Sequence, residues 1–289
     1  MSSSYRTACV TLIDILGFKH MVDDIYRDEP STIANILELF VSEQSVPDQQ
    51  SPTGALVSHS PTAVLSFSDT VIRIADMPKS FRGLPHTRVV KVPDDTGEAA
   101  TTIAHEILSL RRIQRKLATN SFGFEKPGFP GLMIRGGLTV GEISNDHIGS
   151  HVFGPALNRA ATLEQSAVHP MIAIDPDCLK NYSTMFSELV KSGAVASASS
   201  DNCYIDYFTP ESHWSGFNHD FDYGFNRGAA REQLTRMAEM LRQRLNTHIG
   251  NEDVRSKYLW AKERHNDAVF KSATAFSLAQ DEIDALLVD

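Results

Sequence analysis

The chain has 289 residues, of which 42% are hydrophobic and 22% are charged, a composition typical of globular proteins that excludes disorder as its main state. Its formal net charge of −9 lacks the basic excess of proteins that bind duplex nucleic acid or anionic lipid. Cys9, Cys178 and Cys203 are odd in number and far apart, which argues against a disulfide framework or a zinc ribbon and predicts small buried side chains.

The N-terminal residues give no sign of a targeting segment. Residues 1–7 are polar, and Asp14 interrupts the apolar run that follows, so a signal peptide is not expected. No apolar run reaches the roughly 18 residues that a transmembrane helix requires. We therefore expect a cytoplasmic protein whose partners include neither nucleic acid nor membrane.

The first part of the chain predicts two strand regions separated by a helix. Residues 8–14 are apolar and β-branched, which predicts a buried strand ending at Asp14. Apolar residues at helical spacing predict a helix over 31–41. Residues 63–75 alternate in hydrophobicity on both sides of Ser68-Asp69-Thr70, which predicts a hairpin with this triplet at its tip.

The same periodicities predict the remaining elements. In chain order they are a helix over 100–118, a candidate hairpin over 132–154, a helix over 155–168, strands over 171–174 and 203–208, and helices from 228 to the end. This order predicts an α+β fold of the ferredoxin-like split βαβ type, in which helices cover an antiparallel sheet and a C-terminal helical extension follows.

Two aspartates stand where two apolar strands end or turn. Asp14 closes the first strand and Asp69 lies at the hairpin tip, and in a split βαβ sheet these two strands can be neighbours. A single aspartate in such a place is usually a turn residue or a cap. Together, two carboxylates at adjacent strand ends are natural ligands for hard cations, and a pair of metal ions can assist phosphoryl transfer.

Two further segments carry polar features that core packing does not explain. Gly17 follows the first strand, so the main chain there can approach a phosphate, with the Phe18 and Lys19 amides as donors. This glycine signal alone is weak, because glycine is common between strands and helices. Asn158 and Arg159 fall in the first turn of an alanine-rich helix, where asparagine is a poor helix former.

These segments resemble motifs of the class III nucleotidyl cyclases. Residues 11–18 are similar to the first metal motif of that family, and residues 67–70 are similar to its second metal site. The run from Arg135 to Glu164 is similar to its arginine–glycine and asparagine–alanine region. The resemblance covers about residues 8–175, in the family's order.

The resemblance implies the cyclase catalytic domain, working as a homodimer with its sites at the interface. A nucleoside triphosphate would be closed to its 3′,5′-cyclic monophosphate as the 3′-hydroxyl attacks the α-phosphorus and pyrophosphate leaves. Asn158 of the other protomer would orient the ribose. The implied ligands of two Mg²⁺ or Mn²⁺ ions are Asp14, Ile15 (through its carbonyl) and Asp69, and the implied phosphate-binding residues are Gly17, Phe18 and Lys19.

The chain departs from purine cyclases at the base-reading positions. Where the family's purine cyclases have a lysine and often an aspartate, this chain has Leu65 and His151, the base-binding candidates, so a different base is expected. Thr162 stands in place of the transition-state arginine, with Arg159 and Arg135 as candidate replacements. For Arg135 a structural ion pair is an equal alternative, and for His151 a strand histidine with satisfied hydrogen bonds is slightly favoured.

Residues 257–266 form a tail motif that, with the hairpin and the arginine–glycine run, resembles the stand-alone pyrimidine cyclases of bacterial Pycsar anti-phage systems. This implies UTP or CTP as substrate, with cyclic UMP favoured as the commoner product, and signalling to a separate effector. Tyr258 and Trp260 are expected to pack the last helices, within an extension over 210–289, against a catalytic domain over 1–209.

Two other functions stay open at this point. The first is an adenylate or guanylate cyclase with an unusual base pocket, which Leu65 and His151 disfavour. The second is a non-catalytic cyclase-like module that binds nucleotide, which Thr162 favours and the two aspartates disfavour.

Overall fold

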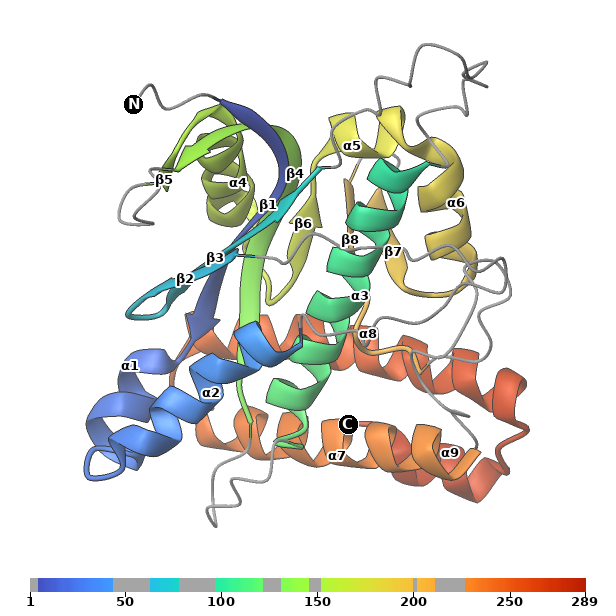
Figure 1. Ribbon diagram of the computed structural model, residues 1–289. Helices are drawn as coiled ribbons and strands as arrows, with labels where there is room; N and C mark the ends of the chain where they lie inside the picture. The colour runs from blue at the N-terminus through green and yellow to red at the C-terminus, as the bar shows by residue number, and fades with distance from the viewer. Residues whose placement is uncertain are drawn as a thin grey trace.

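A computed structural model describes residues 5–43, 63–77, 97–121, 131–145, 152–199, 202–210 and 227–289. These residues form one mixed sheet with helices on both faces and a helical layer beneath it (Figure 1). The strands are β1 (Arg6–Leu16), β2 (Ala63–Phe67), β3 (Thr70–Asp76), β4 (Met133–Asn145), β5 (Val152–Phe153), β6 (Ile172–Ile174), β7 (Val195–Ser199) and β8 (Asn202–Ile205). The helices are α1 (Phe18–His20), the π-helix η1 (Met21–Ile25), α2 (Pro30–Ser42), α3 (Glu98–Ala118), α4 (Pro155–Ser166), α5 (Pro176–Asn181), α6 (Ser183–Lys191), α7 (Arg227–Thr247), α8 (Glu252–Phe276) and α9 (Gln280–Leu286).

The predicted α+β fold with C-terminal helices is confirmed. The sheet order is β2-β3-β1-β4-β6-β8-β7, and its first four strands are antiparallel neighbours in the split βαβ arrangement. The sheet differs from the expected antiparallel one at β6, which pairs with β4 in parallel. The reason is the connection: α4 returns the chain across the sheet, and such crossovers join parallel strands.

Side chains of β1 alternate between two cores. Cys9 and Ile13 point into the α3 cluster, which also contains Ile36, Ile103 and Ile107. Ala8 and Val10 point to the other face, into the α4 cluster, whose other members are Ile72, Ile74, Ile143, Ala156 and Ala160. Because successive residues of a strand face opposite ways, the pattern of β1 fixes which side of the sheet each later residue faces.

A charged pair lies inside the α3 side of the sheet. Arg73 of β3 is fully buried, and its guanidinium donates to both carboxylate oxygens of Glu106 on α3, at 2.7 and 2.9 Å. It also donates to the main-chain oxygen of Phe40 on α2. Two helices and a strand are therefore joined through one buried side chain.

The C-terminal helices pack beneath the ends of β1 and β4 (Figure 1). Their α8 cluster joins Leu241, Tyr258 and Val269 of α7 and α8 to Met133, Tyr207 and Phe208. Trp260 stacks on His169 with ring centroids 5.1 Å apart. The expected packing role of Tyr258 and Trp260 is confirmed, whereas the division of the chain at 209/210 stays a prediction.

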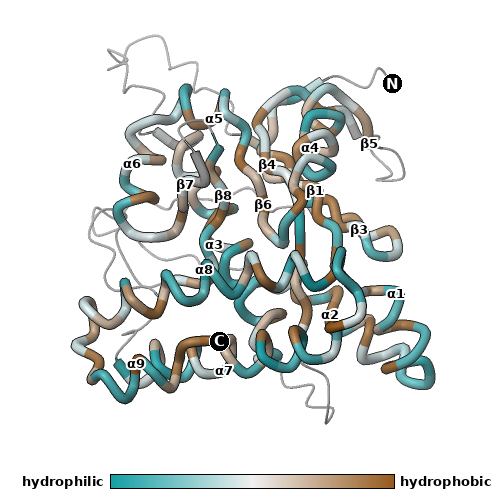
Figure 2. The backbone as a smooth tube through the Cα atoms, turned by 180° about the vertical axis from the view of Figure 1, so that it is seen from behind, coloured by the Kyte–Doolittle hydropathy of each residue, from teal (hydrophilic) through white to brown (hydrophobic). Residues whose placement is uncertain are grey.

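Alternating hydrophilic and hydrophobic residues along α7 and α8 are visible in Figure 2, as expected for helices with one face in a core. No helix in the described part of the chain is long and apolar enough to span a bilayer. The three cysteines are free thiols, and Cys9 and Cys178 are buried.

Two stretches differ from the sequence-based expectation. The region between 175 and 202 has no predicted element, yet it contains α5, α6 and β7. The second strand of the hairpin expected over 132–154 is reduced to β5, and residues 146–151 lie outside the described residues.

Candidate functional site

Asp14 lies on β1 between two structural neighbours. Its register partners are Thr70 on β3 and Arg135 on β4. Leu12, two residues before Asp14, packs on the α4 cluster, and Leu16, two residues after it, packs on the α8 cluster. Since alternate residues share a face, Asp14 is held half-buried between α4 and the C-terminal helices.

Asp69 is brought to Asp14 by the hairpin between β2 and β3. Phe67 pairs with Thr70, so only Ser68 and Asp69 form the turn, with Ser68 in the left-handed region at φ 58°. The Ile15 N–H donates to the Asp69 main-chain oxygen at 2.9 Å. This bond fixes the hairpin tip beside the end of β1, so the two aspartates predicted from sequence are neighbours.

Arg135 joins Asp14 to a third carboxylate that sequence reasoning missed. Its Nη2 lies 2.9 Å from Asp14 Oδ2, and its Nε lies 2.7 Å from Glu164 Oε1 on α4. The approach of α4 depends on Gly137, where a Cβ atom would stand 2.4 Å from the Ala160 oxygen. The arginine–glycine run is the signal for this contact, because a glycine in a strand marks close approach by another segment.

The electrostatics of this cluster favour an additional cation. Burial raises the pKa of Asp14; Arg135 opposes that shift, Asp69 adds to it, and Lys257 of α8 lowers the pKa. Burial also raises the pKa of Glu164, with Arg135 opposing and Asp14 adding to the shift. A positive charge beside these carboxylates would favour their ionised forms.

The donor set fits a metal ion that is bound partly by its substrate. Among the described residues no group of three or more His, Cys, Asp or Glu side chains is arranged to hold a metal. Magnesium usually takes one or two protein carboxylates together with substrate phosphates, so Asp14 and Asp69 are sufficient in kind and number. The role of the Ile15 carbonyl stays a prediction.

The expected phosphate-binding segment directly follows β1. Gly17 has φ 82°, a left-handed conformation that favours glycine, and it lets the chain turn into α1. Phe18 is buried and anchors the turn, while Lys19 is exposed. The first amides of a helical turn have no intrahelical acceptor, so those of Phe18 and Lys19 are suited to an anion.

Asn158 and Arg159 lie on the exposed side of α4 and do not join the Asp14 cluster. The Arg159 guanidinium binds Asp175 and Asp177, with its Nη2 2.7 Å from an oxygen of each. Thr162 donates to the Asn158 oxygen within the helix, at 3.0 Å. Of the two candidate arginines, Arg135 is therefore the one that contacts the aspartate pair within a protomer.

Of the two base-binding candidates, the structure describes only Leu65. Leu65 on β2 is half-buried and packs against the α4 cluster, so it offers an apolar contact. His151 lies outside the described residues. Their roles in base recognition stay predictions.

Lys257 is a second residue whose place sequence reasoning did not reach. It lies on α8, three residues before Trp260, and its charge lowers the pKa of both Asp14 and His169. The tail motif therefore supplies a cation whose charge reaches Asp14, in addition to its packing residues. The motif at 257–266 was the only sequence sign of Lys257. What Lys257 contacts is decided by the position of α8, a helix far from Asp14 in the sequence.

Comparison with known proteins gives distant structural likenesses. No family model and no curated protein matches the chain. The guanylyl cyclase Cya2 is 17% identical over 63% of this chain and 81% of its own, with a TM-score of 0.39. The adenylyl cyclase CyaB from P. aeruginosa is 15% identical over 78% and 100%, with a TM-score of 0.41. A bacterial light-regulated adenylyl cyclase is 9% identical over 83% and 59%, with a TM-score of 0.44. The chain is similar to these structures, but likenesses this loose carry no functional argument.

Proposed function

We propose that this chain is a nucleotidyl cyclase of the class III type that closes a nucleoside triphosphate to its 3′,5′-cyclic monophosphate and pyrophosphate. The observation that carries the proposal is the Asp14–Asp69 pair. The Ile15–Asp69 hydrogen bond fixes the pair at one sheet end, and the charge of Asp69 helps to raise the pKa of Asp14. Two carboxylates held side by side, with no third His, Cys, Asp or Glu ligand among the described residues, suit cations that arrive with a triphosphate.

Each residue of the cluster then has a distinct task. Asp14 and Asp69 would hold two Mg²⁺ or Mn²⁺ ions. When bound, these ions would neutralise the triphosphate and make the 3′-hydroxyl more acidic. Arg135, fixed by Glu164 at 2.7 Å, orients Asp14 through one carboxylate oxygen. Gly17, Phe18 and Lys19 offer main-chain donors to the phosphates.

The rest of the site is completed by a second copy. Asn158 is exposed on α4, which suits a contact with ribose bound to another protomer. We therefore propose a homodimer with sites at its interface, in which residues 1–209 form the catalytic domain and residues 210–289 the extension. Arg135 contacts Asp14 of the aspartate pair, whereas Arg159 is held by Asp175 and Asp177, so Arg135 is the better candidate to replace the missing transition-state arginine.

We propose a pyrimidine triphosphate as substrate, UTP before CTP. Support comes from Leu65, an apolar side chain at the position where the resemblance predicts a purine-reading lysine. A pocket without that donor loses its means of selecting a purine. In this proposal the cyclic product acts in the cytoplasm on a separate effector in anti-phage defence.

The test is to incubate the purified chain with each of the four triphosphates and Mn²⁺ and to separate the products by chromatography. We expect cyclic UMP, or cyclic CMP, as the main product. Asp69→Asn should abolish it. Asp76→Asn, with the same charge change at the other end of β3, should retain it. Cyclic AMP or cyclic GMP would refute the pyrimidine assignment only, whereas product from Asp69→Asn would refute the metal site.

A non-catalytic nucleotide-binding module is the second candidate. It is favoured by Thr162, whose hydroxyl bonds within its own helix and supplies no charge, and by the Asp14–Arg135 ion pair, which neutralises a carboxylate without metal. This candidate predicts that triphosphate binds and no cyclic product forms from any of the four. Equilibrium binding measured beside the product assay distinguishes the two candidates.

A further inference from the structure

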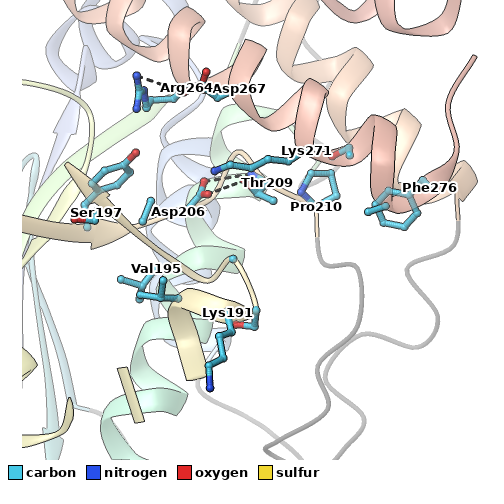
Figure 3. Close-up of a pocket in the computed structure, with 17 residues that line it drawn as sticks. Lys191, Val195, Ser197, Asp206, Thr209, Pro210, Arg264, Asp267, Lys271 and Phe276 are labelled. Carbon is cyan, nitrogen blue, oxygen red and sulfur yellow. Dashed lines mark hydrogen bonds and ion pairs between the residues drawn. The ribbon is translucent and has the colours of Figure 1, made fainter. Parts of the chain in front are cut away.

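A cavity of about 360 Å³ lies between the edge of the sheet at β7 and β8 and the C-terminal half of α8 (Figure 3). It is separate from the aspartate pair, because Lys271 in its wall is roughly 20 Å along α8 from Lys257, at about 1.5 Å per residue. Its lining includes Val195, Tyr204, Arg264, Lys271, Ser272 and Phe276.

Two hydrogen-bonding groups in the cavity wall are buried without a partner. The Ser272 side chain is 2% exposed, and its hydroxyl has no hydrogen-bond partner among the described residues. The Arg264 Nε is likewise buried and unpaired among them, although its Nη2 lies 3.4 Å from Asp267. Buried polar groups are nearly always paired, so these two indicate a missing ligand or solvent.

The carboxylates of the cavity are already occupied. Asp206 accepts bonds from the Phe208 and Thr209 amides at 2.9 and 3.2 Å and from the Thr209 hydroxyl at 2.7 Å. Asp267 faces Arg264. Lys271 has no ion pair within the described part of the chain, and Figure 3 shows its side chain extending across the cavity. The unpaired groups are therefore donors, and the lining holds three cations, Lys191, Arg264 and Lys271, against the two carboxylates of Asp206 and Asp267.

A second basic cavity shows that positive charge alone is not the criterion. It measures about 280 Å³ and lies between α3 and α7. Arg112 and Lys116 there both pair with Glu43, and Arg236 bonds to Glu232 at 2.8 Å. The cations named here all pair with protein carboxylates, whereas Lys271 has no ion pair within the described part of the chain.

We propose that the cavity between β7–β8 and α8 binds a small phosphorylated molecule, with its phosphate between Arg264, Lys271 and Ser272. Guanidinium and ammonium groups make strong charge-assisted bonds to phosphate oxygens, and a serine hydroxyl adds a neutral donor. The volume exceeds that of a bare phosphate and falls within the range of small-molecule sites, roughly 300–1,000 Å³. The apolar walls at Val195 and Phe276 suit an organic remainder.

The proposal is independent of cyclase activity, so its test measures binding alone. Calorimetric titration with inorganic phosphate and with uridine 5′-monophosphate, in EDTA to exclude metal at Asp14 and Asp69, supplies the two probes. Binding of either probe should weaken by about tenfold or more in Lys271→Gln, because a charge-assisted bond is lost. Ser272→Ala should weaken it less. Lys262→Gln, on the same helix but outside the cavity, should bind as wild type does.

Two outcomes would overturn the proposal. One is no heat of binding with either probe at millimolar concentration in a protein whose thermal melting is normal. The other is binding that Lys271→Gln and Lys262→Gln weaken equally, which would mean a general charge effect. Because Ser272→Ala changes no charge and only removes a hydroxyl, it keeps the test decisive even if Lys271→Gln lowers stability.

Discussion

His265 on α8 makes the stability of the C-terminal helices depend on pH. The side chain is fully buried, and its Nε2 lies 2.9 Å from the Leu286 oxygen, which requires the proton on Nε2. Its Nδ1 is buried without a partner among the described residues. A proton on Nδ1 would therefore be a buried unpaired donor, and burial is the main reason that the pKa falls from 6.5 to about 4.

The direction and size of the effect follow from this shift. Between pH 6.5 and about 4 the unfolded chain binds a proton that the folded chain does not, so stability decreases as the pH falls through that interval. At about 1.36 kcal/mol per pKa unit, the loss approaches roughly 3 kcal/mol near pH 4. Above pH 6.5 the full contribution is retained.

The assay compares urea unfolding of the wild type and of His265→Gln from pH 7 to pH 4. Glutamine keeps a donor for the Leu286 oxygen but does not titrate. The carboxylates titrate in both proteins, so the difference between the two curves isolates His265. We expect the wild type to lose roughly 3 kcal/mol more than the variant over this range. Parallel curves would refute the reasoning.

Three further changes test the buried ion pair, the α4 contact and the tail lysine. Arg73→Met should cost roughly 3–5 kcal/mol in urea unfolding, because it leaves Glu106 buried and unpaired; a loss below about 1 kcal/mol would contradict this. Gly137→Ala should destabilise by about 1–3 kcal/mol by forcing α4 off β4, whereas Gly141→Ala, whose new Cβ meets its nearest neighbour at 3.3 Å, should cost less; equal losses would contradict the close contact. Lys257→Gln should raise the KM for the triphosphate about tenfold with little change in kcat, and Lys262→Gln on the same helix is the control. An unchanged KM in an active Lys257→Gln enzyme would exclude this lysine from the site.

The centre of the sheet and the aspartate pair were predictable from sequence because local patterns decide them. The alternation over 63–75 specifies the hairpin, and β1 is apolar enough to demand a central place. Once those strands are neighbours, Asp14 and Asp69 must meet. The parallel pairing of β6 was harder to predict, since a run of three residues carries no sign of its partner.

Contacts made by distant helices were not predictable. Glu164 and Lys257 look like ordinary charged residues of helices, and only the positions of α4 and α8 bring them to Asp14. Arg159 shows the converse case, since its sequence position suggested catalysis and its fold neighbours are Asp175 and Asp177. Tertiary placement, which single-sequence patterns do not encode, determines these partners.

The central place of β1 has a consequence for how the protein is made. Translation produces this strand before its two partners, since β3 follows only after α2 and β4 only after α3. At about 5–20 residues per second, the edge that β4 finally covers stays unpaired for roughly ten seconds of synthesis. An apolar strand with an open edge is prone to pair with other chains, so the segment that carries Asp14 is open to such pairing until β4 has been made.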